Sequence, residues 1–300
     1  MLCSRKERVR PAASRHDGNL NTISFWLCAV ARGEYSRFTV SWYIVQACYL
    51  QQQGRGSFLQ PEGQQRTRES LMASPGNHLL NLLPCKDRTR FIAACDIVDL
   101  PLAQVLCEPG KPTKYVYFPT DGFISLIAVV KGSPGVEVGM VGREGMLGVQ
   151  LALGVPTAPL HALVQGSGSA LCMASKAFKI ELAASPALQG ELHRYLYVLM
   201  AQLAESAACV RFHQIGPRLA RWLLMSQDRA QASSFEVTQE FLAYMLGVRR
   251  VGVTAAAGAL QQSGLISYSR GRLTVLDRKG LERAACSCYA ADRKTYAELM

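Results

Sequence analysis

Two pairs of arginines near the C-terminal end carry the clearest chemistry in the sequence. Arg249 and Arg250 open an apolar-periodic segment, and Arg270 and Arg272 flank a short turn. A guanidinium group can donate two hydrogen bonds to the edge of a guanine, or it can bind a phosphate. The spacing predicts a nucleic-acid-binding surface. The alternative interpretation is that these arginines are solvated side chains with no partner.

The residues before and between these pairs have the pattern of a helix-turn-helix. Thr238 can cap a helix that runs to about residue 245, and Gly247 permits the sharp turn that follows. A second helix is expected over residues 248–262, followed by Gly264 as its C-terminal cap. The residues on its buried side are Val253, Ala257 and Leu260. The first turn of this helix, with its arginines, is the end that enters the major groove in helix-turn-helix proteins.

A basic β-hairpin follows the second helix. Residues 265–276 read as two short strands with a tip at Ser269–Gly271. Such a wing typically touches the phosphate backbone. The order of these elements predicts a winged helix-turn-helix that binds duplex DNA. The residues expected at its DNA surface are Thr238, Gln239, Arg249, Arg250, Thr254, Arg270 and Arg272.

The charge distribution favours the same interpretation. The formal net charge is +11. Residues 206–300 carry 13 basic and 7 acidic side chains, whereas residues 72–205 carry 10 of each. A neutral body beside a basic C-terminal module is typical of a nucleic-acid binder.

Other candidate chemistry is weaker. The ten cysteines contain no Cys-x-x-Cys pair, and Cys286-Ser-Cys288 is tighter than the usual zinc or cluster spacings. We therefore expect buried, reduced thiols, no metal site and no cofactor. His161 could ligate a metal or heme, although a lone histidine in an apolar strand is more often structural. A metal-dependent β-barrel enzyme would need several converging ligands, and no enzymatic activity is expected.

The elements in front of this module predict a second domain. Residues 77–95 have helical spacing, and short apolar runs then alternate with turns, which indicates an antiparallel roll or barrel. The predicted strands are Asp96–Cys107, Tyr115–Phe118, Phe123–Val130, Val136–Val141, His161–Gln165 and Ala170–Ala174. The fold class is therefore α+β.

One long helix is expected from Pro186 to about Phe212, and Gly216-Pro217 is expected to break it. Leucines recur along it at intervals of three or four residues, namely Leu188, Leu192, Leu196, Leu199 and Leu203. This narrow stripe predicts a dimer interface. The alternative is a helix lying on its own β-roll.

Four segments follow from these patterns. Residues 1–71 show no lasting period and are expected to be a disordered or non-native extension ahead of Met72. A sensor domain is expected over 72–185, a dimerisation helix over 186–215 and the DNA-binding domain over 216–300. No segment is long and apolar enough to span a membrane, so a cytoplasmic protein is expected.

Taken together, residues 77–285 resemble the Crp–Fnr family of transcription regulators, relatives of the cyclic-AMP receptor protein. The stretches 116–119 and 122–125 also resemble the β-roll of a branch with a degenerate ligand pocket. The resemblance implies a cyclic-nucleotide-binding-like roll, a homodimer, double-stranded DNA as partner and RNA polymerase as a further one. The family's base-contacting positions fall on Arg249, Arg250, Val251 and Ala255.

Two departures from the family pattern carry predictions. Residues 147–150 and 160–162 lack the Glu and Arg that hold the ribose and the cyclic phosphate, which leaves Gly148, Val149, Leu160 and His161 as a degenerate pocket. We therefore predict that cyclic AMP does not bind tightly. Val251 and Ala255 replace polar readers, so the DNA site should differ from that of the receptor protein. The alternative is a sensor or interaction protein that has lost specific DNA binding.

Overall fold

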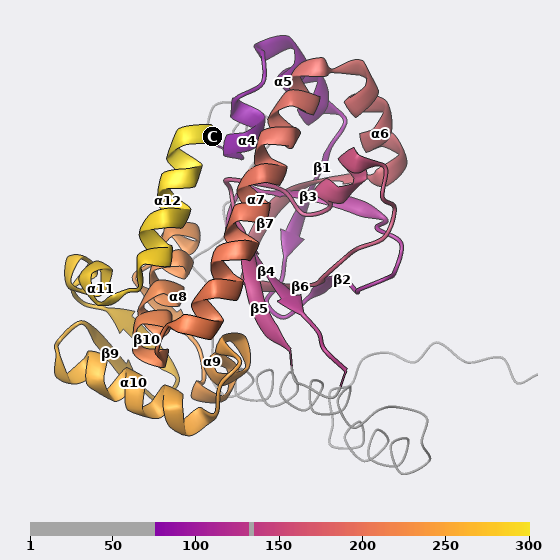
Figure 1. Cartoon of the computed structure of the whole chain (residues 1–300). Helices are drawn as coiled ribbons and strands as arrows, with labels where there is room; N and C mark the ends of the chain where they lie inside the picture. The colour runs from indigo at the N-terminus through magenta and orange to yellow at the C-terminus, as the bar shows by residue number, and fades with distance from the viewer. Residues whose placement is uncertain (1–75, 132–134) are drawn as a thin grey trace, which may run out of the picture.

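The computed structural model describes residues 76–131 and 135–300 (Figure 1). The extension predicted for residues 1–71 lies outside the described residues. The described chain begins with two short helices, α4 (His78–Asn81) and α5 (Cys85–Ala93). The strands that follow are β1 (Asp96–Leu100), β2 (Val105–Cys107), β3 (Tyr115–Pro119), β4 (Phe123–Ala128), β5 (Val136–Val141), β6 (His161–Gly166) and β7 (Gly168–Ala174). A 3-10 turn, η1 (Val149–Leu153), lies between β5 and β6.

These strands form two antiparallel sheets. Their orders are β1-β7-β3 and β2-β6-β4-β5. Apolar side chains from both sheets meet in one cluster, which includes Leu100, Ile124, Val141 and Val164. The predicted α+β fold with an antiparallel roll is therefore confirmed. The single predicted strand over 96–107 is instead two strands, because residues 101–104 form a turn with Ala103 at φ 64°.

The roll leads into three helices, α6 (Ser175–Ala184), α7 (Pro186–Phe212) and α8 (Ile215–Ala230). The Ser185 hydroxyl caps α7 by accepting a hydrogen bond from the Leu188 amide at 3.1 Å. The break between α7 and α8 falls at His213 and Gln214, which is earlier than predicted. Pro217 lies in the first turn of α8, where its missing amide hydrogen costs no helical hydrogen bond.

Helix α7 packs on its own roll. Leu188 and Leu192 are buried in a cluster with Phe91, Phe118 and Phe178. The Gln202 side chain also accepts a hydrogen bond from the backbone amide of Met140 in β5, at 3.0 Å. The N-terminal part of the leucine stripe is therefore core of the protomer, which corrects its assignment to a dimer interface.

The C-terminal part contains β8 (Ser234–Glu236), α9 (Gln239–Leu246), α10 (Arg250–Gln262), β9 (Ile266–Ser269), β10 (Arg272–Val275), α11 (Arg278–Ala284) and α12 (Ser287–Leu299). The three strands form a sheet in the order β8-β10-β9. Its apolar side chains join Phe123, Ile127 and Met140 of the roll in one continuous core. Helix α12 runs beside α7 (Figure 1).

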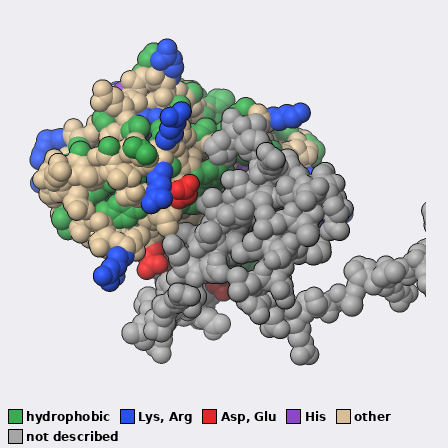
Figure 2. Space-filling view, turned by 90° about the horizontal axis from the view of Figure 1, so that it is seen from below, with side chains coloured by type: hydrophobic (Ala, Val, Ile, Leu, Met, Phe, Trp, Pro, Cys, Tyr) green, Lys and Arg blue, Asp and Glu red, His purple; other side chains and the backbone are tan. Residues whose placement is uncertain are grey.

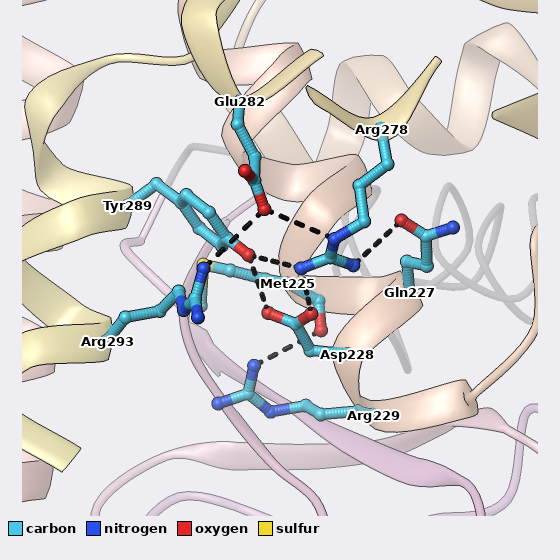
Figure 3. A network of polar contacts seen from close by, with 8 residues as sticks. All are labelled: Met225, Gln227, Asp228, Arg229, Arg278, Glu282, Tyr289 and Arg293. Atoms are coloured by element: carbon cyan, nitrogen blue, oxygen red, sulfur yellow. Dashed lines mark hydrogen bonds and ion pairs between the residues drawn. The ribbon is translucent and has the colours of Figure 1, made fainter. Parts of the chain in front are cut away.

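A polar network fastens the last two helices to α8 (Figure 3). The Arg278 guanidinium donates to Asp228 at 2.6 Å, to the Tyr289 hydroxyl at 2.7 Å and to Glu282 at 3.2 Å. Tyr289 in turn donates to the other oxygen of Asp228 at 2.9 Å. The network fixes α11 and α12 relative to α8. Within the described residues, no helix is long and apolar enough to cross a membrane.

Candidate nucleic-acid interface

Helices α9 and α10 form a helix-turn-helix whose turn depends on one glycine. The Thr238 hydroxyl caps α9 by accepting from the Phe241 amide at 3.1 Å. Gly247 ends that helix with φ 62°, a conformation that costs little without a Cβ atom. The Val248 amide then donates back to the carbonyl of Ala243 at 2.9 Å, which closes the turn. The second helix begins at Arg250 with Arg249 as its N-cap, two residues later than predicted.

The buried and exposed faces of α10 are clearly separated. Its buried side chains are Val253, Ala257 and Leu260, the three that the sequence placed there. Five side chains expected at the DNA surface all belong to exposed residues, namely Arg249, Arg250, Val251, Thr254 and Ala255. Val251 is 79% exposed, which is unusual for a β-branched apolar residue and leaves its methyl groups available to a partner.

The first helix supports the second through one hydroxyl. Gln239, the first residue of α9, accepts a hydrogen bond from the Thr254 hydroxyl at 2.6 Å. Thr254 lies one turn into α10, so this bond links the exposed turns of the two helices. Gln239 is half-buried at this position, and the Thr238 hydroxyl is engaged in the cap of α9.

The wing presents its arginines at a tight turn. Ser269 pairs with Arg272, so the hairpin loop has only two residues. Both have positive φ, 51° at Arg270 and 82° at Gly271, as a type I′ turn requires. A non-glycine residue such as Arg270 rarely adopts this left-handed backbone region, where the strain costs about 1–2 kcal/mol. Arg270 is exposed at the wing tip.

The electrostatics of this face favour an anionic partner. Arg250 makes one weak ion pair, at 4.0 Å to Glu240, and both side chains are more than 60% exposed. Such a pair is worth at most about 1 kcal/mol, so the Arg250 guanidinium can leave it for a phosphate or a base. In the described part of the lower face, Lys and Arg side chains outnumber the acidic ones (Figure 2). Arg250 also lies near Tyr268, whose pKa burial raises to about 12.

The residues of the degenerate pocket do not form a polar site. Gly148 adopts φ 97° ahead of η1, and a Cβ atom there would lie 2.9 Å from a methyl carbon of Val116. Val149 packs in the apolar cluster around Phe118, and Leu160 packs in the separate cluster between the sheets. His161 is partly buried, and burial lowers its pKa while Glu108 opposes that shift.

Helix α7 has a second apolar face beside the predicted leucine stripe. Leu188 and Leu192 are fully buried in the protomer core, and Leu196 and Leu199 are partly buried against it. Leu203 is also partly buried. The three most exposed large apolar side chains of α7 are instead Tyr197, Met200 and Phe212, which are 58%, 60% and 76% exposed. Exposed alanines continue this face at Ala204, Ala207 and Ala208.

Two features of the site were not foreseen. Strand β8 adds a third strand to the wing. In its register with β10, Glu236 lies opposite Arg272. Its three residues are too few to show a period, although Phe235 between polar neighbours is a weak strand signal. The second feature lies in the loop after β5, where Glu144 pairs with the buried Arg229 of α8 at 2.8 Å.

Comparison with known proteins places these features in context. Residues 217–284 match the Crp-like helix-turn-helix domain. The structure is similar to FixK2 from Bradyrhizobium japonicum, with 13% identity and a TM-score of 0.55, covering 64% of this chain and 98% of that one. It is also similar to the c-di-GMP-responsive global regulator CLP from Xanthomonas campestris, with 17% identity and a TM-score of 0.53, covering 65% and 100%.

A CRP/FNR-family transcriptional regulator from Thermus thermophilus is 22% identical, with a TM-score of 0.52 and coverage of 63% of this chain and 98% of that one. At these identities the likeness describes the fold. A search of curated protein sequences found no match to this chain.

Proposed function

We propose that this chain is a transcription regulator of the Crp/Fnr type that binds a specific duplex DNA sequence as a homodimer through its C-terminal Crp-like helix-turn-helix domain. The observation that carries the proposal is the exposed first turn of α10. It combines two arginines, an exposed valine and a threonine on one surface, while the opposite side of the same helix is buried.

Each part of this surface has a separate role in the proposal. Arg250 and Arg249 donate to base edges or to phosphates at the start of the major-groove helix. Val251 and Ala255 offer apolar contact to the methyl group of thymine. Thr254 is oriented by Gln239, and Arg270 and Arg272 of the wing bind the phosphate backbone.

The homodimer rests on the exposed face of α7. Tyr197, Met200 and Phe212 recur along it with small alanines between them, so two such helices can approach closely. A two-fold pair would present two α10 helices to half-sites one helical turn apart, about 34 Å, on a roughly palindromic site. In this proposal the regulator is cytoplasmic, because its DNA partner is there. RNA polymerase is its further partner.

The roll acts as a sensor whose ligand is not cyclic AMP. Its interior is filled by an apolar cluster that includes Leu126, Leu147 and Leu160, and a buried cyclic phosphate would meet no cation from that cluster. Calorimetry with cyclic AMP should therefore show no binding in the micromolar range. A micromolar dissociation constant would contradict this part of the proposal alone.

The proposal is tested by selecting DNA from a random duplex pool with the full chain. We expect one enriched, roughly palindromic motif, and an affinity for it that falls steeply with salt because phosphate contacts release counterions. A scrambled duplex of the same length and composition is the control. Equal affinity for both duplexes would leave a protein that has lost specific DNA binding, and the proposal would be wrong.

A further inference from the structure

Four potential metal ligands converge where α7 meets the C-terminal segment. Cys209 and His213 stand at the end of α7, and Cys286 and Cys288 stand at the start of α12. Their ligand atoms, three Sγ and one imidazole nitrogen, all lie within 4.8 Å of one another. The pairs Cys209–Cys286 and His213–Cys288 are about 75 residues apart in the sequence, so only the fold brings them together.

Two of the distances between these atoms suit a single small ion. The Cys209 and Cys286 sulfurs are 3.5 Å apart, and the Cys288 sulfur is 3.5 Å from Nδ1 of His213. A tetrahedral zinc ion with Zn–S near 2.3 Å and Zn–N near 2.0 Å would separate two sulfurs by about 3.8 Å, and a sulfur from a nitrogen by about 3.5 Å. An iron–sulfur cluster binds its thiolates through different iron atoms, which requires larger distances between the ligand sulfurs.

Local backbone structure explains why the four ligands point to one place. Cys209 lies in the last turn of α7, and His213 is the C-cap residue whose backbone amide donates to the Cys209 carbonyl, which holds the two residues side by side at the helix end. Cys286 is the N-cap of α12 and Cys288 lies in its first turn, where the helix dipole favours a thiolate. The three cysteines are buried in a cluster of their own, and His213 is partly exposed at its edge.

The surrounding charges compensate a metal–thiolate centre. Three thiolates with one divalent ion carry a net charge of −1, which is costly to bury alone. Arg218 and Arg221 are both buried, and each interacts electrostatically with Cys209 and Cys286. Arg221 is held there by Asp292 of α12 at 2.6 Å and by the Ser206 hydroxyl at 3.2 Å. Because Asp292 already compensates the charge of Arg221, the Arg218 guanidinium supplies the balancing charge around the ligands.

We propose that Cys209, His213, Cys286 and Cys288 bind one zinc ion in a closed, tetrahedral structural site. With three sulfurs and one nitrogen, all four positions are occupied by protein, so the ion has no open position for catalysis. It fastens the start of α12 to the end of α7, beside the two-residue joint that leads to α8. This revises the expectation from the Cys286-Ser-Cys288 spacing, which considered only neighbours in sequence. The site does not depend on DNA binding.

The test is metal analysis of the full chain, purified without a histidine tag under reducing conditions. We expect about one zinc per chain and a large loss in Cys209→Ser and Cys288→Ser. Cys85→Ser removes an exposed cysteine outside the cluster and should keep the zinc. Cobalt substitution should give the intense visible bands of a tetrahedral site and thiolate-to-cobalt charge transfer in the parent chain.

A fourth variant guards against loss by unfolding. His213→Cys offers four thiolates, so it should retain the metal and increase the thiolate-to-cobalt absorption. Two results would overturn the proposal. One is a chain that binds no zinc or cobalt after reconstitution although it is folded by circular dichroism. The other is a Cys209–Cys286 disulfide, found by mass spectrometry after alkylation, in place of the metal.

Discussion

Arg229 of α8 and Glu144 of the loop after β5 form an ion pair of 2.8 Å that joins the C-terminal helical part to the roll. The same carboxylate oxygen accepts the amide of Gly142 at 3.0 Å, and the guanidinium donates to the carbonyl of Met225 at 3.2 Å. Arg229 is 8% exposed and Glu144 is 20% exposed at the side chain. Both charges therefore depend on each other for compensation.

Breaking this pair from one side should be costly. Arg229→Met leaves the Glu144 carboxylate half-buried without its partner, which typically lowers the free energy of unfolding by about 3–5 kcal/mol. Urea denaturation measures the loss. The double variant Arg229→Met with Glu144→Leu should recover much of it, because no unpaired charge remains. Purely additive losses would mean that the two residues do not act as a pair.

Arg250 should determine sequence preference more than general affinity. Arg250→Ala should weaken binding to the selected DNA site by about 1–3 kcal/mol and relax the preference at one base pair. The matched control is Lys294→Ala, which removes one equally exposed positive charge from α12, away from the interface. Gel-shift titrations on the selected and scrambled duplexes measure both effects. Equal losses on the two duplexes would make Arg250 a phosphate contact.

A substitution at the wing tip should affect the free energy of unfolding and the DNA affinity differently. Arg270 is held at φ 51°, where asparagine is tolerated better than arginine. Arg270→Asn should leave the free energy of unfolding unchanged or raise it by up to about 1 kcal/mol, while it weakens DNA binding and lowers its salt dependence. Thermal unfolding and salt-dependent titrations check the two halves. A destabilised variant with unchanged DNA affinity would assign the residue a structural role instead.

The two apolar faces of α7 can be distinguished by one substitution on each. Met200→Asp places a charge on the exposed face and should give a monomer in sedimentation velocity, with its core intact. Leu192→Ala removes a fully buried side chain and should cost about 2–5 kcal/mol of unfolding free energy. If Met200→Asp stays dimeric, the interface lies on another surface.

Glu137 should make stability fall as the pH rises. Burial raises its pKa from about 4.5 to about 7, although the Ser125 hydroxyl, which donates at 2.5 Å, and Arg229 oppose the shift. Between these pH values the folded chain holds more protons than the unfolded one, so the unfolding free energy should fall by up to about 1.4 kcal/mol per pH unit from this group.

The pH effect is isolated by difference. Glu137→Gln should flatten this slope and raise the melting temperature relative to the parent chain at pH 8, where the carboxylate is charged. Glu298→Gln, which changes an exposed carboxylate of α12, should leave the slope as it is. If the difference in unfolding free energy between the parent chain and Glu137→Gln stays constant from pH 5 to 7, the pKa of Glu137 is not raised and the prediction is wrong.

The sequence predicted those parts of the molecule that depend on local rules. Gly247 had to form a turn with positive φ, Thr238 had to cap, and the spacing of Val253, Ala257 and Leu260 fixed the buried side of α10. These signals act within a few residues, so they can be recognised without a fold.

Features that depend on distant partners could not be predicted in this way. A leucine stripe has the same spacing whether it packs on its own roll, as Leu188 and Leu192 do, or on a second chain. Cys286 and Cys288 acquire their neighbours only because α12 folds back along α7. The placement of Glu144 against Arg229 likewise depends on how the roll meets α8.

The way α12 lies along α7 restricts how the molecule can move. Only His213 and Gln214 separate α7 from α8, and a two-residue connection would by itself permit a hinge. The last helix leaves the C-terminal part and returns along the roll side, where Met300 contacts the apolar cluster around Phe91 and Phe118. Helix α12 therefore bridges that hinge. A rotation of the C-terminal part relative to the roll requires α12 to slide along α7 or to detach from it first.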